Sequence, residues 1–467
     1  MKLRSAIVLL GAAMAGCAVG PDYREPQQAV SDHFGNAAQP ALDQGDVVAQ
    51  FWTLLDDPVL DRLVSDALAA NRDLAQAAGN LQASRAAARL VGFDRFPTIT
   101  ANGFYAHSLV SAQQLPGATR DQRTIDSYDA GFDAAWELDF FGRVRRSNQA
   151  ARAAAGAAEA TLRDAIVSVT AEVVRNYCVL RGLQDQLAVA ERNEINQRQT
   201  LQLVQVRLDA GRGTQLDVSR AAAQLATTEA TIPPLRASIA TTIHRLSVLT
   251  GQQPQALVPE LSPLQAMPTL PALNAIGGPE ALLRRRPDVR IAERNLAAAT
   301  ARIGVEVADL FPRITFLGSV GYDSPTGRDV GSSGSQRYSW GPSISWAALD
   351  LGRVRARIHV ARAETDIALA AYEAAVLNAL EDTENSLVNY GESQRREVTL
   401  ERAATESTTA ARLARQRFEG GLSDFLSVLQ AERDALAAQD SLAQGRTQTA
   451  TSLIAVYKAL GGGWMAR

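Results

Sequence analysis

Stretches with a helical spacing of apolar residues alternate along this chain with shorter stretches in which every second residue is apolar. The longest helical stretch covers 143–210, which contains no proline. Its apolar residues follow one another at steps of three or four positions: Val173, Tyr177, Leu180, Leu183, Leu187 and Ala190. That spacing is typical of a coiled-coil seam, and a helix of this length would extend about 100 Å. After the glycines at 211 and 213 a return helix is predicted over 214–250, with a bend expected at Pro233 and Pro234.

Two stretches in the first half have the spacing of β-strands. Over 96–108, the residues Ile99, Phe104 and Tyr105 stand among threonine and glycine. Over 126–137, apolar residues alternate with polar or small ones: Tyr128, Ala130, Phe132, Ala134 and Trp136. This is a period of two. Turn-forming residues fill 109–125, so the two strands are expected to form a hairpin.

The second half of the chain repeats this order of elements. Asp73 is followed by Phe96 after 23 residues, and Asp288 is followed by Phe311 after the same interval. A period of about 200 residues is too long for a solenoid repeat, so we interpret it as one duplicated unit. Its second copy is predicted to contain a helix over 287–310, strands over 311–323 and 337–347, and long helices over 353–419 and 423–460.

This organisation predicts that the chain is divided into five consecutive segments. Shorter helices are expected from Pro58, with Asp57 as the N-cap, and over 72–93. The predicted parts are a signal peptide (1–16), an N-terminal arm (17–55), a first repeat (56–251), a proline-rich linker (252–278) and a second repeat (279–467).

Composition and charge exclude several classes of protein. The chain has 467 residues, a formal net charge of -3 and only 6% aromatic residues. No block of basic residues suggests nucleic-acid binding. The four histidines are scattered and do not form a metal-ligand cluster with the two cysteines. Motifs of nucleotide, zinc and hydrolase enzymes are absent from the sequence, and the adjacent carboxylates Glu381 and Asp382 do not face each other on a helix. We therefore expect neither an enzyme nor a cofactor.

The N-terminus reads as a targeting segment. Lys2 and Arg4 precede a short apolar run, which is too short to span a bilayer. The tetrapeptide Met-Ala-Gly-Cys at 14–17 resembles a bacterial lipobox, in which Cys17 is acylated after cleavage. Ala18 resembles the second residue of lipoproteins that are sent to the outer membrane. The alternative is ordinary secretion, with Cys17 lost in the cleaved peptide.

The four predicted strands suit a membrane. Each has about 10 to 13 residues, and a tilted transmembrane strand needs about 9 to 11. Trp136, Trp340 and Trp346 are candidate membrane-interface aromatics. Four strands are too few to close a barrel, and open edges are not tolerated in lipid. Three chains are therefore expected to share one barrel of twelve strands. A soluble hairpin in a periplasmic coiled-coil protein is the alternative.

Four separated motifs resemble NodT-type outer-membrane factors, lipoproteins of the TolC-like efflux family. The first is Cys17-Ala18-Val19-Gly20-Pro21-Asp22-Tyr23, and the second is Phe51-Trp52 with Asp57-Pro58-Val59-Leu60 and Ala67-Leu68-Ala69-Ala70-Asn71-Arg72-Asp73-Leu74. The third is Arg285-Arg286-Pro287-Asp288-Val289-Arg290 with Ala301-Arg302-Ile303-Gly304 and Phe311-Pro312, and the fourth is Tyr457-Lys458-Ala459-Leu460-Gly461-Gly462-Gly463-Trp464. The resemblance implies a mainly α fold with a small membrane β part, in which a homotrimer forms a 12-stranded outer-membrane barrel and a long periplasmic helical tunnel.

The same resemblance implies a function and partners. Such a duct conducts drugs or other small toxic compounds passively, together with an inner-membrane RND transporter and a periplasmic adaptor protein. It is anchored in outer-membrane lipid and extends into the periplasm. A duct for type I protein secretion is the alternative within the family, and a structural periplasmic lipoprotein is the alternative outside it.

The resemblance also indicates where a gate and a docking tip should lie. The gate is expected at Leu426 and Gln430, with Asp424 and Asp217 as further acidic candidates; at Gln430 the family has aspartate instead. Helix capping is the alternative role for both aspartates. The adaptor-docking tip is expected at Gly211, Gly213, Thr214, Gly420, Gly421 and Ser423.

Overall fold

The computed structural model describes residues 18–27, 30–31, 33–35, 48–273 and 276–464. It divides into two compact units. The first comprises Met1–Gln27, Asn80–Glu159 and Ile291–Glu373, and the second comprises Gln28–Gly79, Ala160–Arg290 and Ala374–Arg467. Each unit combines segments of both sequence repeats, so compactness and duplication divide the chain along different lines.

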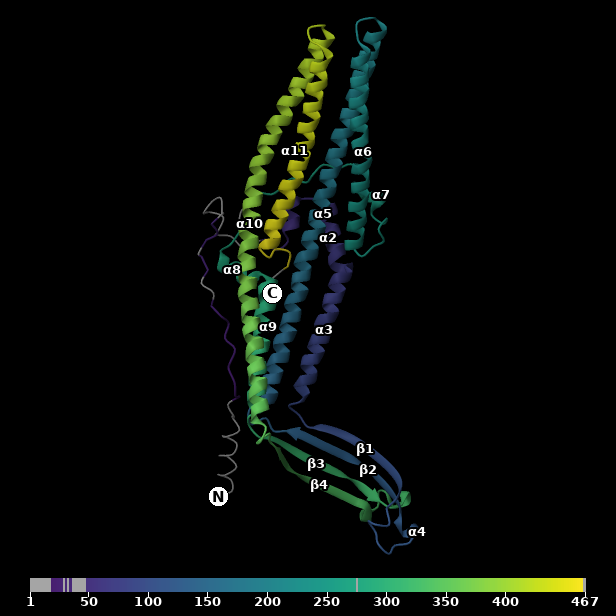
Figure 1. Cartoon of the computed structure of the whole chain (residues 1–467), viewed down its shortest axis with the longest axis vertical. Helices are drawn as coiled ribbons and strands as arrows, with labels where there is room; N and C mark the ends of the chain where they lie inside the picture. Colours follow the sequence, from purple (N-terminus) through teal and green to yellow (C-terminus); the bar gives the residue numbers. More distant parts are fainter. Residues whose placement is uncertain (1–17, 28–29, 32, 36–47, 274–275, 465–467) are drawn as a thin grey trace. The chain divides into compact units, whose positions relative to one another are not determined.

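The first unit contains one antiparallel sheet of four strands in the order β1-β2-β3-β4 (Figure 1). The strands are β1 (Thr98–Leu109), β2 (Thr124–Glu137), β3 (Arg313–Ser324) and β4 (Gln336–Ser345). The pairing of β2 with β3 joins the two repeats into one sheet. At its middle Gly131 faces Gly321, where a Cβ atom on either residue would lie within 2.6 Å of a carbonyl oxygen of the other strand. Two glycines therefore permit the close approach of the strands.

Strands β1 and β3 begin two residues later than the apolar pattern predicts. Pro97 immediately precedes β1, and Pro312 immediately precedes β3. Proline has no N–H to donate to a ladder, so pairing starts after it. The loops expected to be irregular contain short turns of helix: α4 (Arg120–Arg123), η3 (Gly327–Asp329) and η4 (Ser333–Ser335).

Long helices make up most of the chain. They are α3 (Arg72–Phe93), α5 (Arg143–Asp209), α6 (Gln215–Leu249), α9 (Pro287–Ala308), α10 (Leu351–Glu419) and α11 (Phe425–Ala459). In the first unit, helices α5 and α9 meet through the small residues Ala153, Ala297 and Ala298, which are buried together. Alanine supports helix formation and allows helix backbones to approach closely.

The second unit holds the main hydrophobic core. The seam residues Val173, Tyr177 and Leu180 of α5 are fully buried, and Phe51 stacks on Tyr457 at 4.8 Å between ring centroids. Further short elements surround this core: η2 (Phe51–Leu55), α2 (Pro58–Ala70), α7 (Val258–Leu261) and α8 (Pro279–Arg285). The predicted linker thus contains α7, a single turn that leaves no periodicity to recognise.

Asp57 and Cys178 illustrate how this core satisfies its polar groups. Asp57 caps α2 by accepting hydrogen bonds from the backbone N–H groups of Val59 and Leu60, and it also accepts one from the Tyr177 hydroxyl at 2.5 Å. Burial raises the pKa of the Cys178 thiol to about 12, so this thiol is uncharged and unreactive at neutral pH.

The duplication is visible in equivalent hydrogen bonds. Asn71 donates to the carbonyl of Leu249, in the last turn of α6, at 2.9 Å. Arg286 stands at the equivalent place in the second repeat and donates to the carbonyl of Ala459, the last residue of α11, at 3.1 Å. Each repeat therefore ties the start of a shorter helix to the end of its return helix.

Candidate functional site

Two tight loops connect the long helices, α5 to α6 and α10 to α11, and they contain the predicted tip residues. Gly211 has φ +71° and Gly421 has φ +74°, both in the left-handed region. In each loop the residue after this glycine donates to the carbonyl of Arg207 or Arg417 at 2.8 Å. This is the hydrogen-bond pattern of a Schellman motif, which explains why glycine ends both helices.

The return helices begin with polar caps in both loops. Thr214 accepts a hydrogen bond from the backbone N–H of Asp217, and its hydroxyl donates to the Asp217 carboxylate at 2.7 Å. Asp424 caps α11 by accepting from the N–H of Ser427 at 3.0 Å and from its hydroxyl at 2.6 Å. The capping role considered for the two aspartates is therefore present in the structure.

The predicted gate residues share one exposed face of α11. Phe425 and Val428 are buried, whereas Leu426 is 39% exposed and Gln430 is exposed. Leu426 and Gln430 are four residues apart, a spacing that brings side chains together on a helix. Their side chains are therefore available to line a passage, and the Asp424 carboxylate stands at the N-terminus of the same helix.

The contacts that join the ends of α5 and α10 were not predicted from the sequence. The guanidinium of Arg207 lies 3.9 Å from the centroid of the Phe418 ring and donates to the carbonyls of Phe418 and Glu419 at 2.7 and 3.1 Å. The Phe418 ring belongs to a cluster of buried apolar residues that come from all four long helices next to the loops: Val204, Ala221, Phe418, Phe425 and Val428. The recurrence of Arg207 as Arg417 was the signal in the sequence, but it indicated no partner.

A second missed group lies farther from the loops. Arg415 donates to the Glu432 carboxylate at 2.7 Å and to the Thr200 hydroxyl at 2.5 Å. Glu432 is buried, and Thr200 also donates to it at 3.0 Å. This network bridges α5, α10 and α11, so the hairpins of the two repeats are held together by charged as well as apolar contacts.

The three predicted interface tryptophans differ in their surroundings. The indole N–H of Trp136 donates to the carbonyl of Arg95, and that of Trp346 donates to the carbonyl of Leu310, each at 3.0 Å. Both therefore lie near the helix-proximal end of the sheet. Trp340 lies at the middle of β4, is 73% exposed and stacks with Phe316 at 6.3 Å.

Other predicted features lie outside the described residues or give no candidate site. Cys17 lies outside them. Within the described ranges, no group of three or more histidine, cysteine or acidic side chains is placed to hold a metal ion. No helix among the described residues carries an apolar stretch long enough to cross a bilayer.

Comparisons with known proteins agree over nearly the whole chain. The family model described as outer membrane efflux protein matches residues 63–252 and 278–462. Nodulation protein T of Rhizobium leguminosarum bv. trifolii is 31% identical over 456 residues, which are 97% of this chain and 95% of that protein. The solvent efflux pump outer membrane protein SrpC of Pseudomonas putida is 30% identical, with 99% of each chain covered.

Solved structures show the same architecture. The outer-membrane channel OprN superimposes with a TM-score of 0.90 at 43% sequence identity, covering 96% of this chain and 100% of that one. The Campylobacter jejuni CmeC outer membrane channel also gives a TM-score of 0.90, at 18% identity, and so supports the fold alone. The predicted fold class, mainly α with a small β part in the manner of TolC-like channels, is confirmed. The chain belongs to the outer membrane efflux protein family.

Proposed function

We propose that three copies of this chain assemble into one duct, whose barrel of twelve strands spans the outer membrane and whose helical hairpins line a periplasmic tunnel. The observation that carries this proposal is the four-stranded sheet. Among the described residues, β1 and β4 each pair with one neighbour only, so the sheet has two open edges. Open edges are not tolerated in a bilayer, and pairing β1 with β4 of a neighbouring copy would close them.

The exposed side chains of the sheet support the same assembly. Tyr105, Phe132 and Tyr338 are aromatic and exposed, and the strand register places them on the same face of the sheet. Such residues on the lipid-facing side are typical of membrane barrels.

The cargo and the partners follow from the family. Relatives carry names such as solvent efflux pump outer membrane protein and toluene efflux pump outer membrane protein. We therefore propose that this duct passively conducts drugs or other small toxic compounds delivered by an inner-membrane RND transporter through a periplasmic adaptor. The adaptor would dock at the glycine-rich loops, where the Ser423 hydroxyl is buried and has no hydrogen-bond partner within the described chain.

We propose further that acylation of Cys17 anchors the chain in outer-membrane lipid. One acyl chain gives only marginal membrane binding. Several acyl chains, together with a barrel, would make insertion firm.

Disulfide cross-linking between β1 and β4 tests the assembly. Cysteine replaces Thr100 in β1 and, in separate variants, Gly341 or Ser343 in β4, because the strand register places all three on the same face of the sheet. The buried Cys178 stays in place. Because the two edges meet only between copies, we expect oxidised, heat-denatured samples to run as covalent dimers and trimers that reducing agent returns to monomers.

Single-cysteine variants are the matched controls, and they should remain monomeric after the same oxidation. Absence of cross-linked species from every pair, in protein shown to be inserted in the outer membrane, would exclude the shared barrel.

The charge of Asp424 provides a test of the gate. Hydrogen bonds from Ser427 lower the pKa of Asp424, so its carboxylate stays charged below the usual range for aspartate. Asparagine caps helices as well as aspartate does, so Asp424→Asn should keep the fold and remove only the charge. We expect the variant to lose cation preference, measured as the reversal potential across a planar bilayer under a salt gradient.

The pH dependence follows from the same shift. The cation preference of the wild-type duct should persist through mildly acidic pH and fall only as the pH drops through the lowered pKa. An unchanged reversal potential in Asp424→Asn would assign Asp424 to capping alone. Asp424→Ala, which also removes the cap, separates the two roles because it should additionally lower the melting temperature.

A further inference from the structure

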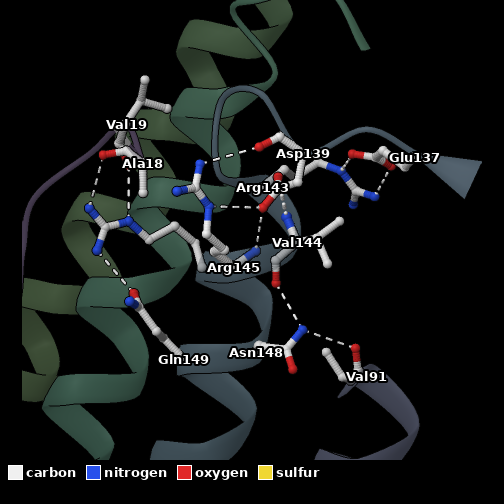
Figure 2. A network of polar contacts seen from close by, with 11 residues as sticks. Ala18, Val19, Val91, Glu137, Asp139, Arg143, Val144, Arg145, Asn148 and Gln149 are labelled. Atoms are coloured by element: carbon white, nitrogen blue, oxygen red, sulfur yellow. Dashed lines mark hydrogen bonds and ion pairs between the residues drawn. The ribbon is translucent and has the colours of Figure 1, made fainter. Parts of the chain in front are cut away.

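The residues directly after Cys17 lie against the first turn of α5. The backbone N–H of Val19 donates to the carbonyl of Phe141 at 3.1 Å. The Arg146 side chain is 3% exposed, and it donates to the carbonyl of Val19 at 3.0 Å through Nε and to those of Ala18 and Gly20 at 3.3 and 3.1 Å through Nη2. Figure 2 shows the carbonyls of Ala18 and Val19 beside the neighbouring polar contacts of Arg143, Arg145 and Asn148. One buried guanidinium thus donates hydrogen bonds to the carbonyl groups of three consecutive residues.

Glycines allow the backbone of this segment to come unusually close. A Cβ atom on Gly20 would lie 2.5 Å from the Cα of Gly304, and one on Gly142 would lie 2.6 Å from the Cα of Ala18. A Cβ atom on Gly304 would lie 2.6 Å from Cγ of Arg146. Real Cβ atoms do not reach such distances, so the segment fits only because these positions are glycine.

Two side chains of the segment add polar contacts. The Tyr23 hydroxyl donates to the Glu293 carboxylate at 2.5 Å, and Asp22 forms an ion pair with Arg146 at 2.9 Å. Glu293 is 1% exposed and is also paired with Arg294. Burial and the hydrogen bond to Glu293 raise the pKa of the Tyr23 hydroxyl, so it remains a donor at physiological pH.

Below, residues 18–23 are called the docked arm, and Gly142, Arg146, Glu293 and Gly304 are called the arm groove. The duplication provides an internal control for this groove, because each repeat carries the equivalent positions. Arg146 follows Gly-Arg-Val-Arg at 142–145, and Ala356 follows the same motif at 352–355. The alanine side chain has no donor and cannot form hydrogen bonds with carbonyl groups.

The other equivalents are changed as well. Gly304 lies seven residues before Phe311, and the residue seven before Phe96 is Arg89. Glu293 lies five residues after Asp288, and the residue five after Asp73 is Ala78. Three of the four groove positions are therefore replaced in the other copy by residues that would either block the arm or fail to bind it. The two repeats therefore differ at the positions that contact the arm, and this difference indicates that the arm groove is a specific binding site for the arm.

We propose that the arm groove is a binding site for the mature N-terminus of this chain, which fixes the attachment point of the lipid anchor at the junction between β2 and α5. This rests on the proposed acylation of Cys17. Consecutive Cα atoms are about 3.8 Å apart, so a held Ala18 leaves no slack between an acylated residue 17 and the helix-proximal end of the sheet. The anchor then enters the bilayer beside the strands of its own chain.

Electron paramagnetic resonance of a spin label at position 24 tests the docking in the full-length protein. Arg24 is exposed and directly follows the docked arm, so Arg24→Cys gives a labelling site, while the buried Cys178 thiol does not react. We expect an immobilised spectrum for the otherwise unchanged chain. Arg146→Ala should raise the mobile fraction about tenfold or more, because hydrogen bonds to a charged group are lost. Gly304→Ala should raise it as well, because the added Cβ would collide with the Arg146 side chain.

Matched variants at the equivalent positions are the controls. Gly352→Ala adds a methyl group to a helical glycine with no atom within 4 Å of its Cβ, and Arg89→Ala changes the position equivalent to Gly304. Both should leave the label immobilised. Equal mobility in all four variants would overturn the arm groove as a binding site.

The same measurement on Cys17→Ser separates docking from lipidation. We expect the label to stay immobilised without the acyl chain, since the groove binds residues that follow it. Mass spectrometry of the mature N-terminus reports the acylation independently. An unacylated N-terminus with an Arg146-dependent immobile label would overturn the anchoring role, whereas loss of immobilisation in Cys17→Ser would overturn the groove as a site that holds the arm by itself.

Discussion

Replacing Gly211 or Gly421 with tryptophan is expected to abolish efflux while trimers and outer-membrane insertion remain intact. Neither glycine has an atom of its own chain within 4 Å of a built Cβ. A larger side chain can therefore leave the backbone here without a clash at its Cβ, and its bulk would keep an adaptor from reaching the loop backbone. Efflux is measured as the drug susceptibility of a pump-deficient host that is supplied with the cognate transporter and adaptor, and trimers are measured by resistance to SDS.

Alanine at the same positions is the control for backbone strain. Both glycines have a positive φ, so any other residue is strained by about 1–2 kcal/mol. Alanine and tryptophan share this cost and differ only in bulk. Efflux that survives both Gly211→Trp and Gly421→Trp would exclude the two loops as the docking surface, and equal losses with alanine would assign the effect to strain.

Arg286→Ala is expected to cause a large loss of stability in the second unit. Arg286 is buried and donates to the carbonyls of Ala379 and Ala459 and to the carboxylates of Asp288 and Asp382. Burial acts to lower the pKa of Arg286, but the hydrogen bonds and charges of the two aspartates outweigh it, so the net shift is upward and the group stays charged. Its removal leaves helix carbonyls and a carboxylate without their donor, which costs about 3 kcal/mol.

The equivalent residue of the first repeat makes a matched comparison. Asn71 caps α3 by accepting from the N–H groups of Asp73 and Leu74, and it donates to the carbonyl of Leu249. It carries no charge, so Asn71→Ala should cost about 1 kcal/mol. Thermal unfolding followed by circular dichroism compares both variants with Arg302→Ala, which alters an exposed arginine on α9 and should have little effect. An Arg286→Ala variant as stable as Arg302→Ala would refute the proposed role.

Helices and strands could be predicted closely because their signals are local. The seam of α5 follows from the steps between Val173, Tyr177 and Leu180, all of which are buried, and any reader of the sequence can count those steps. Two features were not predicted correctly. One element was too short to show a period, and the start of one strand was shifted by a single proline. The turn α7 has four residues, and Pro97 delays the start of β1.

The candidate site divides in the same way. The glycines that end α5 and α10 were predictable, since glycine has a known place after a helix. The hydrogen bonds from Arg207 to Phe418 and Glu419 were not predictable, because these residues lie more than 200 positions from Arg207. The sequence around an arginine on a polar helix surface does not show whether its side chain has a partner.

The sequence by itself determined the long helices, the four strands and the duplication, because periodicity, helix-ending glycines and repeated motifs are properties of neighbouring or regularly spaced residues. Only the tertiary structure decided that β2 pairs with β3 and that Arg146 holds the arm after Cys17. It also showed that Arg286 and Asn71 both donate a hydrogen bond to the end of a return helix, one through a charged guanidinium and the other through a neutral amide. Each of these contacts joins segments brought together by folding. The hydrogen-bond partners in these contacts are backbone groups, which every residue carries, so no residue type in the sequence indicates where such a contact will form.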